Sequence, residues 1–346
     1  MNILVVVVSL VLLITLHELG HFLFAKKFDV KVHEFGIGIP PRLIGKKIGE
    51  TIYSINLLPL GGFVRMLGED ERVDDKRSFS EKPAWQRAII LVAGVASFWI
   101  IAVLIFAFVA FGWGVMSIAP EDAEVDAFLL VNQVDEEIER EKDIRVQDII
   151  KEVNGKEVSK TADFENLLKE NGKTITIQRG DKIEEVDISE FDSDEILSFL
   201  GLVRATEERK SLTESFSFGA RQTINVTRLQ AGGIWMAIRG AITGEGLPEG
   251  MELGGPVMIG DMATDALDRG LGDYLMFVGI IATILAFMNI LPIPALDGGR
   301  LLFLAIEKIK GSPIPVRVEQ TVNAVFFVLL LTLMVLITVR DIYNIF

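Results

Sequence analysis

The stretch Ile3-Leu-Val-Val-Val-Val-Ser-Leu-Val-Leu-Leu-Ile-Thr-Leu-His17-Glu18-Leu-Gly-His21-Phe-Leu-Phe-Ala25 decides the fold. It is almost entirely apolar, and it is as long as the roughly 17–25 residues that cross a bilayer as a helix. It lacks the basic start and the small-residue cleavage site of a signal peptide, so we expect it to be retained. Three similar runs follow, at Ala88–Val115, Leu275–Leu291 and Val322–Val339. Four runs exceed what a soluble core requires, and they predict a multi-pass α-helical membrane protein with four transmembrane helices.

The composition agrees with this prediction and excludes several other classes. Half of the 346 residues are hydrophobic, the mean hydropathy is +0.41 and the net charge is −14. Such an acidic chain has no basic surplus with which to bind nucleic acid. The absence of cysteine excludes disulfides, cysteine-ligated zinc, iron–sulfur clusters and a thiol nucleophile.

The charge of the short loops predicts the orientation of the chain in the membrane. Residues 26–87 contain 12 Lys and Arg against 9 Asp and Glu, and residues 300–321 are also basic. Loops rich in Lys and Arg stay in the cytoplasm. We therefore expect a plasma-membrane protein whose termini and acidic segment 114–273 lie outside.

The motif His17-Glu18-Leu-Gly-His21 (HExxH) predicts a metal site in the first span. Residues four apart lie one turn apart on one helix face, so the two imidazoles can hold one Zn²⁺. Glu18 is expected to reach a water at this metal and to act as the general base. Ionisable residues inside a membrane are costly and usually functional. The alternative is a buried His–Glu–His cluster joined by hydrogen bonds alone.

A catalytic zinc site needs a third protein ligand, and Asp297 is the better of two candidates. His33, the remaining histidine, is expected to be an ordinary loop or strand residue just past the first span. Asp297 follows an apolar run that Pro292 and Pro294 interrupt. Its alternative role is the N-cap of a helix over 298–309, and both roles could hold at once.

Taken in order, these motifs resemble the site-2 protease family of intramembrane zinc metalloproteases. HExxH in a first span and Asn289-Ile-Leu-Pro-Ile-Pro-Ala-Leu-Asp297-Gly-Gly299 at the end of a later one are similar to the family's two metal motifs. Phe35-Gly-Ile-Gly38 and Pro59–Asp70 are similar to the β-region of its regulator-of-sigma-E protease branch. The resemblance implies a zinc endopeptidase acting on single-span membrane proteins such as anti-sigma factors or signal-peptide remnants. It also implies that Asn289 hydrogen-bonds the extended substrate backbone.

The resemblance and the composition together predict eight segments. They comprise four spans, a membrane-associated β-hairpin region on the cytosolic side, an inserted extracytoplasmic α+β PDZ-like domain, a linker and a cytosolic loop. In chain order these are 1–25 (first span), 26–87 (β-region), 88–115 (second span), 120–205 (PDZ-like domain), 206–273 (linker with an amphipathic helix over 215–242 and a Gly-rich turn over 244–255), 274–300 (third span), 301–321 (cytosolic loop) and 322–346 (fourth span).

Two of these segments have alternative roles. In the β-region, alternation predicts a strand at 50–57, a turn at Pro59–Gly62 and a returning strand at 63–66. This hairpin could bind unwound substrate by strand addition, or it could only pack the core. The PDZ-like domain has strand patterns at 128–134, 146–158 and 173–178 and helical patterns at 136–142 and 163–169. It could bind a peptide or a substrate ectodomain, or it could cover the mouth of the active site.

Three functions remain open at this stage. The first is the intramembrane protease. The second is a catalytically inactive membrane scaffold, which the intact HExxH disfavours. The third is a metal or proton transporter, which the uncharged second and fourth runs disfavour because a relay needs polar groups in several spans.

Overall fold

The computed structural model divides the chain into two compact units. Unit 1 comprises residues 1–107, 216–264 and 275–346, and unit 2 comprises residues 108–215 and 265–274. The structure describes residues 2–69, 71–120, 122, 125–170, 174–180, 182–244, 246 and 254–345.

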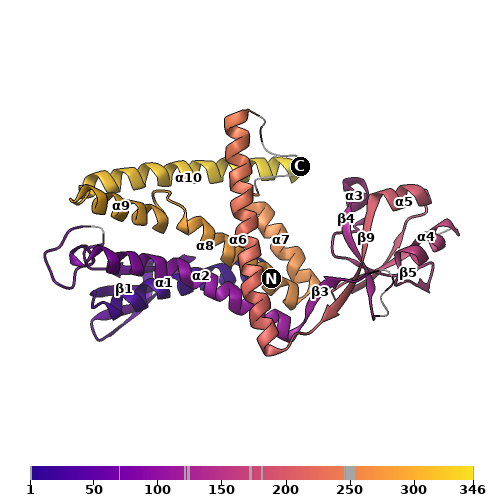
Figure 1. The fold of residues 1–346 in the computed structure, drawn as a ribbon, viewed down its shortest axis with the longest axis horizontal. Helices are drawn as coiled ribbons and strands as arrows, with labels where there is room; N and C mark the ends of the chain where they lie inside the picture. The colour runs from indigo at the N-terminus through magenta and orange to yellow at the C-terminus, as the bar shows by residue number, and fades with distance from the viewer. Residues whose placement is uncertain are drawn as a thin grey trace. The chain divides into compact units, whose positions relative to one another are not determined.

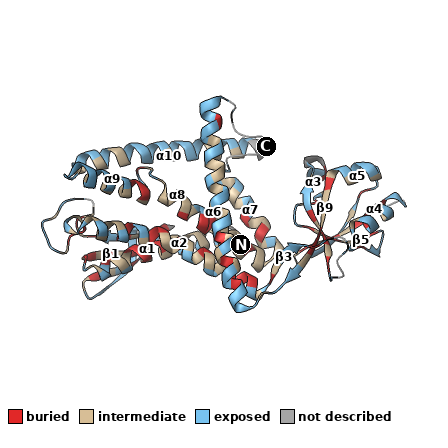
Figure 2. Ribbon diagram, in the orientation of Figure 1, coloured by how far each residue is buried: buried red, intermediate tan, exposed pale blue. Residues whose placement is uncertain are grey.

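Among the described residues, four helices are long and apolar enough to cross a membrane, which confirms the predicted number of spans. The third ends at Ile290 rather than at 300, because the prolines break it, and the fourth begins at 316 rather than at 322. Their spanning segments are Leu4–Lys27, Ala84–Gly112, Leu271–Ile290 and Val316–Tyr343. They belong to α1 (Asn2–Lys27), α2 (Ala84–Gly112), α8 (Leu271–Ile290) and α10 (Val316–Ile345). The side chains of α10 are exposed along nearly all of its length (Figure 2), as expected for a helix that is covered by lipid rather than by protein.

Helices α1 and α2 pack against each other at backbone distance (Figure 1). A Cβ atom at Gly20 of α1 would lie 2.4 Å from the carbonyl oxygen of Ala93 in α2, so only glycine permits this approach. Ala25 and Val30 also form a buried cluster with Ile90 and Leu91 of α2. These contacts hold the helix that contains HExxH in a fixed position against the second span.

Strands β1 (Val32–Ile48) and β2 (Thr51–Met66) form the predicted β-region, but its pairing differs from the prediction. The segments 50–57 and 63–66 are not partners. Glu34 of β1 pairs with Ile52 on one side and with Arg65 on the other, so the first half of β1 lies between the two parts of β2. The predicted hairpin is therefore wrong in its pairing, because upstream residues occupy the place between its strands.

Unit 2 is an α+β unit, and its strands form one sheet in the order β3-β9-β4-β5-β7-β8, with β6 paired to β5. The predicted strand at 128–134 and the predicted helix at 136–142 are confirmed. The elements predicted at 146–158, 163–169 and 173–178 have bounds that differ by a few residues at most from the observed ones. In chain order the elements are β3 (Val115–Ile118), β4 (Phe128–Val134), α3 (Glu136–Lys142), β5 (Ile149–Val153), β6 (Lys156–Glu157), α4 (Thr161–Lys169), β7 (Thr174–Arg179), β8 (Lys182–Asp187), α5 (Ser193–Phe199) and β9 (Leu200–Glu208). Its core includes Leu129, Ile150, Phe164 and Ile177, all buried.

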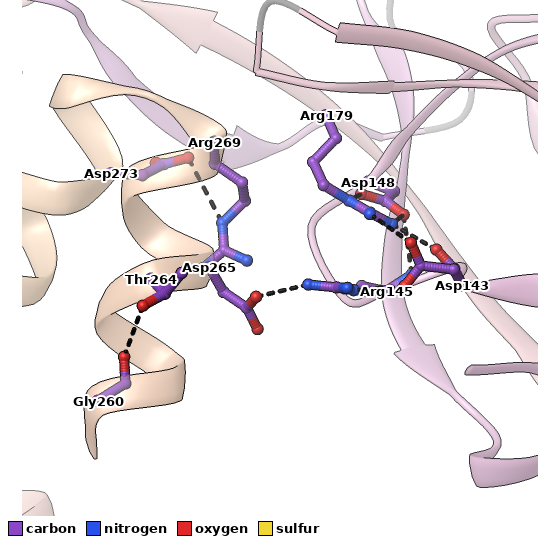
Figure 3. A network of polar contacts seen from close by, with 9 residues as sticks. All are labelled: Asp143, Arg145, Asp148, Arg179, Gly260, Thr264, Asp265, Arg269 and Asp273. Atoms are coloured by element: carbon purple, nitrogen blue, oxygen red, sulfur yellow. Dashed lines mark hydrogen bonds and ion pairs between the residues drawn. The ribbon is translucent and has the colours of Figure 1, made fainter. Parts of the chain in front are cut away.

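A network of ion pairs links the sheet of unit 2 to the end of α7 (Pro256–Arg269), which belongs to the same unit (Figure 3). Arg179 donates to both oxygens of the fully buried Asp148, at 2.8 and 2.7 Å. Arg145 donates to Asp265 of α7 at 2.5 Å. A buried carboxylate requires such a partner, so Arg179 is part of the core rather than of the surface.

Two further helices belong to unit 1. Helix α6 (Leu212–Thr243) covers the predicted amphipathic segment and most of it lies in unit 1, where Gly219 approaches the backbone of Val103 in α2. Helix α9 (Asp297–Lys310) follows the break at the prolines. The predicted turn over 244–255 falls mostly on residues 247–253, outside the described part of the chain.

Candidate metal centre

Three side chains from the two ends of the chain converge at one point. His17 and His21 lie one turn apart on α1, and Asp297 is the first residue of α9. The Nε2 atom of His17 lies 3.2 Å from the Nε2 atom of His21. The Oδ2 atom of Asp297 lies 3.2 Å from Nε2 of His17 and 3.3 Å from Nε2 of His21. The structure thus brings together all three predicted metal ligands.

The triangle of donor atoms fits zinc. Nitrogen and oxygen ligands lie about 2.0–2.1 Å from Zn²⁺, and tetrahedral angles then separate neighbouring donors by roughly 3.3 Å. The observed separations of 3.2–3.3 Å match one face of that tetrahedron. The described residues offer three ligands, which would leave the fourth position for water or substrate, as in catalytic zinc sites.

The environment fixes the orientation of both rings. Nδ1 of His21 lies 2.9 Å from the carbonyl oxygen of Ile90 in α2, so Nδ1–H donates there and Nε2 is left for the metal. The ring of His17 stacks on Phe98 of α2, with 4.5 Å between centroids and 16° between planes. Gly94, also on α2, makes room for His21, because a Cβ atom there would lie 2.2 Å from Nε2.

The turn before α9 aims Asp297 at the histidines. Gly298 and Gly299 lie against this turn, and Cβ atoms there would come within 2.0 Å of the Leu291 carbonyl oxygen and 2.4 Å of the Ile293 carbonyl oxygen. Within the turn, Ala295 has a left-handed φ of 75°, and its N–H donates to Oδ1 of Asn323 in α10 at 3.0 Å. A non-glycine residue in this conformation is strained, and the bond from α10 helps to hold it.

The alternative role for Asp297 as an N-cap is wrong. Helix α9 begins at Asp297 itself, and Leu296 is the N-cap residue without a side-chain capping bond. A carboxylate in the first turn still interacts favourably with the helix dipole. Its oxygen Oδ2, however, points to the histidines.

A cavity of about 220 Å³ adjoins two of the three candidate ligands, His21 and Asp297. Glu18 lines it too, together with the end of β2 and the start of α9, so the predicted general base opens into the same space as these two side chains. Asn289 is not among the described residues that line it, and its Nδ2 donates to the Leu285 carbonyl within α8 at 2.9 Å. His33 lies in β1, as expected, beside Lys31 and Glu50 in a separate pocket.

Sequence reasoning did not single out several residues that shape this site. Ile90 and Phe98 orient the histidines from α2, and Glu69 and Arg300 line the cavity. Ile90 and Phe98 look like ordinary residues of an apolar span, so their role depends on how two helices pack. The sequence does contain a signal for Arg300, because it lies three residues after Asp297 and so shares a helix face with it.

The fold and the site define a class: a multi-pass membrane protein whose HExxH motif in the first span and an aspartate after the third form a candidate metal centre. The profile of peptidase family M50 matches residues 5–333. A "putative zinc metalloprotease" of Clostridium perfringens is 34% identical over 95% of both chains. The regulator of sigma-W protease RasP of Bacillus subtilis is 27% identical over 96% of both chains. The chain belongs to peptidase family M50, the site-2 proteases, and zinc is its expected cofactor.

Proposed function

We propose that this protein is an intramembrane zinc endopeptidase that cleaves peptide bonds within or near the transmembrane segment of membrane-anchored proteins. The observation that supports this most strongly is the convergence of His17, His21 and Asp297 at separations that suit zinc, beside a cavity that Glu18 lines together with His21 and Asp297. A structural metal site would be closed by a fourth protein ligand. The described residues supply three, beside a carboxylate that suits acid–base chemistry.

The residues of this chain would divide the chemistry as follows. His17, His21 and Asp297 would hold zinc, which supplies Lewis acidity that polarises a carbonyl group and makes water more acidic. The Glu18 carboxylate accepts the proton of the attacking water and then donates it to the leaving amine. Phe98 and Ile90 keep the two imidazoles oriented through both proton transfers.

The end of β2 is the proposed binding place for substrate. Phe63, Val64 and Met66 line the same cavity as Glu18, so an extended peptide pairing with this strand would bring its carbonyls to the metal. A transmembrane helix hides its carbonyls in its own hydrogen bonds, so it must unwind before it can be cut. We propose that Asn289 also binds the extended backbone, after release of its bond to Leu285.

The orientation predicted from loop charge gives a site that opens toward the cytoplasm. Substrates would be single-span proteins, such as anti-sigma factors or signal-peptide remnants, and the cleavage would release a fragment.

We propose that the α+β unit is the PDZ-like domain, outside the cytoplasm, where it would bind peptide or limit access to the active site. The name of the RasP relative, a regulator of sigma-W protease, supports a role in transcriptional signalling.

Co-expression with a tagged single-span substrate tests the proposal. We expect wild-type chain to cleave it, and we expect Glu18→Gln or a membrane-permeant chelator to abolish cleavage. Glu18→Gln should keep zinc near one equivalent, because Glu18 is a base and not a ligand. Cleavage at the wild-type rate in this variant would remove Glu18 as the base. Full zinc occupancy with no cleavage of any single-span protein would favour a scaffold, and zinc or proton flux in vesicles would favour a transporter.

A further inference from the structure

One ion pair joins the two walls of the metal-site cavity. The wall from β2 ends at Met66, and the wall from α9 begins at Asp297. Glu69, three residues after the end of β2, uses its Oε1 atom to pair with the Arg300 guanidinium. Its Oε2 atom accepts a hydrogen bond from the Met66 N–H at 3.3 Å. The side chain of Glu69 therefore links the last amide of β2 to the first turn of α9.

The position of Arg300 makes this link relevant to the metal. Residues three apart on a helix share a face, so Arg300 and Asp297 project from α9 to the same side. Both line the cavity, together with Glu69 and Glu18. The side chains of Glu69 and Arg300 are 13% and 29% exposed, so water screens the pair less than it screens a surface pair.

Register is the property that such a link would control. A strand advances about 3.3 Å per residue, so a slip of one residue moves a carbonyl by more than a zinc–ligand distance. Glycine-rich strands specify register weakly. Strand β2 contains Gly61-Gly62 just before the residues that line the cavity. Its edge needs an external support if it is to present one substrate bond to the metal.

We infer that Glu69 and Arg300 are positioning residues that fix the edge of β2 relative to the metal ligands, and so determine which substrate bond is cleaved. This inference rests on the proposed function. The pair positions the peptide and takes no part in the proton transfers. Its loss should therefore change which bond is cleaved more than it changes the rate of cleavage.

Mass spectrometry of the products provides the first test. Wild-type chain should give one dominant cleavage position in a single-span substrate. Glu69→Gln and Arg300→Gln should each reduce the share of that position several-fold in favour of neighbouring bonds. The reversed pair, Glu69→Arg with Arg300→Glu, should restore only part of it, because it rebuilds the ion pair but arginine cannot accept the Met66 N–H. Arg87→Gln is the matched control, because it breaks the pair of Arg87 with Glu307 on the same helix, and neither residue is among the described residues that line this cavity. Its products should match those of wild type.

A second test does not require cleavage. The chain has no cysteine, so Phe63→Cys in the Glu18→Gln background creates a unique thiol in the cavity wall. In a series of substrates, each carries a single cysteine, and its position advances by one residue from one substrate to the next. The yield of disulfide with the introduced thiol should be highest for one substrate of the series. The peak should broaden or shift with Glu69→Gln or Arg300→Gln, and the reversed pair should sharpen it in part. An unchanged profile, with wild-type cleavage intact, overturns this inference alone. A wild-type chain that cleaves no single-span substrate overturns the proposed function and this inference together.

Discussion

Gly94 of α2 and His21 of α1 touch so closely that a Cβ atom at position 94 would lie 2.2 Å from both Cε1 and Nε2 of the imidazole. The second span, which supplies no metal ligand, therefore sets the position of one. We expect Gly94→Ala to displace the ring and to lower zinc affinity about 10- to 100-fold, with a matching loss of activity. Metal analysis of the purified protein measures how much zinc the variant retains.

Gly112→Ala is the control for this prediction. Gly112 lies on the same helix, and no atom lies within 4 Å of the Cβ position there. Its zinc content should equal that of wild type. Equal zinc in Gly94→Ala would show that the ring can move without leaving the metal.

Asp297→Asn tests the third ligand. An amide is a weaker zinc ligand than a carboxylate and brings no charge, so zinc affinity should fall at least about 100-fold, more than for a residue that acts only through a ligand. Competition with a chromophoric chelator measures this affinity. Asp273→Asn, which changes an acid in the first turn of α8, should keep the wild-type value. Wild-type zinc affinity in Asp297→Asn would exclude the aspartate from the coordination sphere.

The buried ion pair of unit 2 makes a prediction about stability (Figure 3). Arg179→Met leaves Asp148, which is fully buried, without its charged partner. Removing one partner of a buried ion pair lowers the free energy of unfolding by about 3–5 kcal/mol. Hydrogen exchange of the full-length protein in increasing urea should show this loss at Ile150 and Ile177, in the core of the unit.

Arg145→Met is the comparison for this prediction, because it breaks the more exposed pair with Asp265 in the same network. Pairs at the surface contribute about 0–1 kcal/mol, so the effect should be small. Equal destabilisation by the two variants would contradict the distinction between a core pair and a surface pair.

Acid should loosen the β-region through Glu50, in the turn between β1 and β2. Hydrogen bonds from Arg77 and Lys26 lower the pKa of Glu50 to about 2 from an ordinary value of 4.5. A carboxylate with a lowered folded-state pKa stabilises the structure fully above its unfolded pKa, and this contribution is lost as the pH falls toward the folded pKa. Between pH 4.5 and 2, hydrogen exchange near residues 48–52 should therefore rise. Glu50→Gln, which carries no charge to lose, should show less change over this range.

The number of spans and the three side chains that converge could be predicted from sequence because each depends on a local pattern. Hydropathy identified the four membrane helices, and helical spacing paired His17 with His21. Asp297 could be found as a lone acid after a broken apolar run. The insertion of β1 between the two parts of β2 could not be predicted, since alternation shows a strand but not its partners. For the same reason, the contacts of Gly94, Ile90 and Phe98 with the histidines emerge only from the packing of two helices.

The hydrogen bond from Ala295 to Asn323 joins α10 to the turn that presents Asp297. During synthesis the two histidines emerge first, the aspartate follows shortly after α8, and Asn323 follows later still. A chain that has inserted α1, α2 and α8 but not α10 therefore lacks the support for this turn. We expect the site to take its final geometry only once α10 has entered the bilayer.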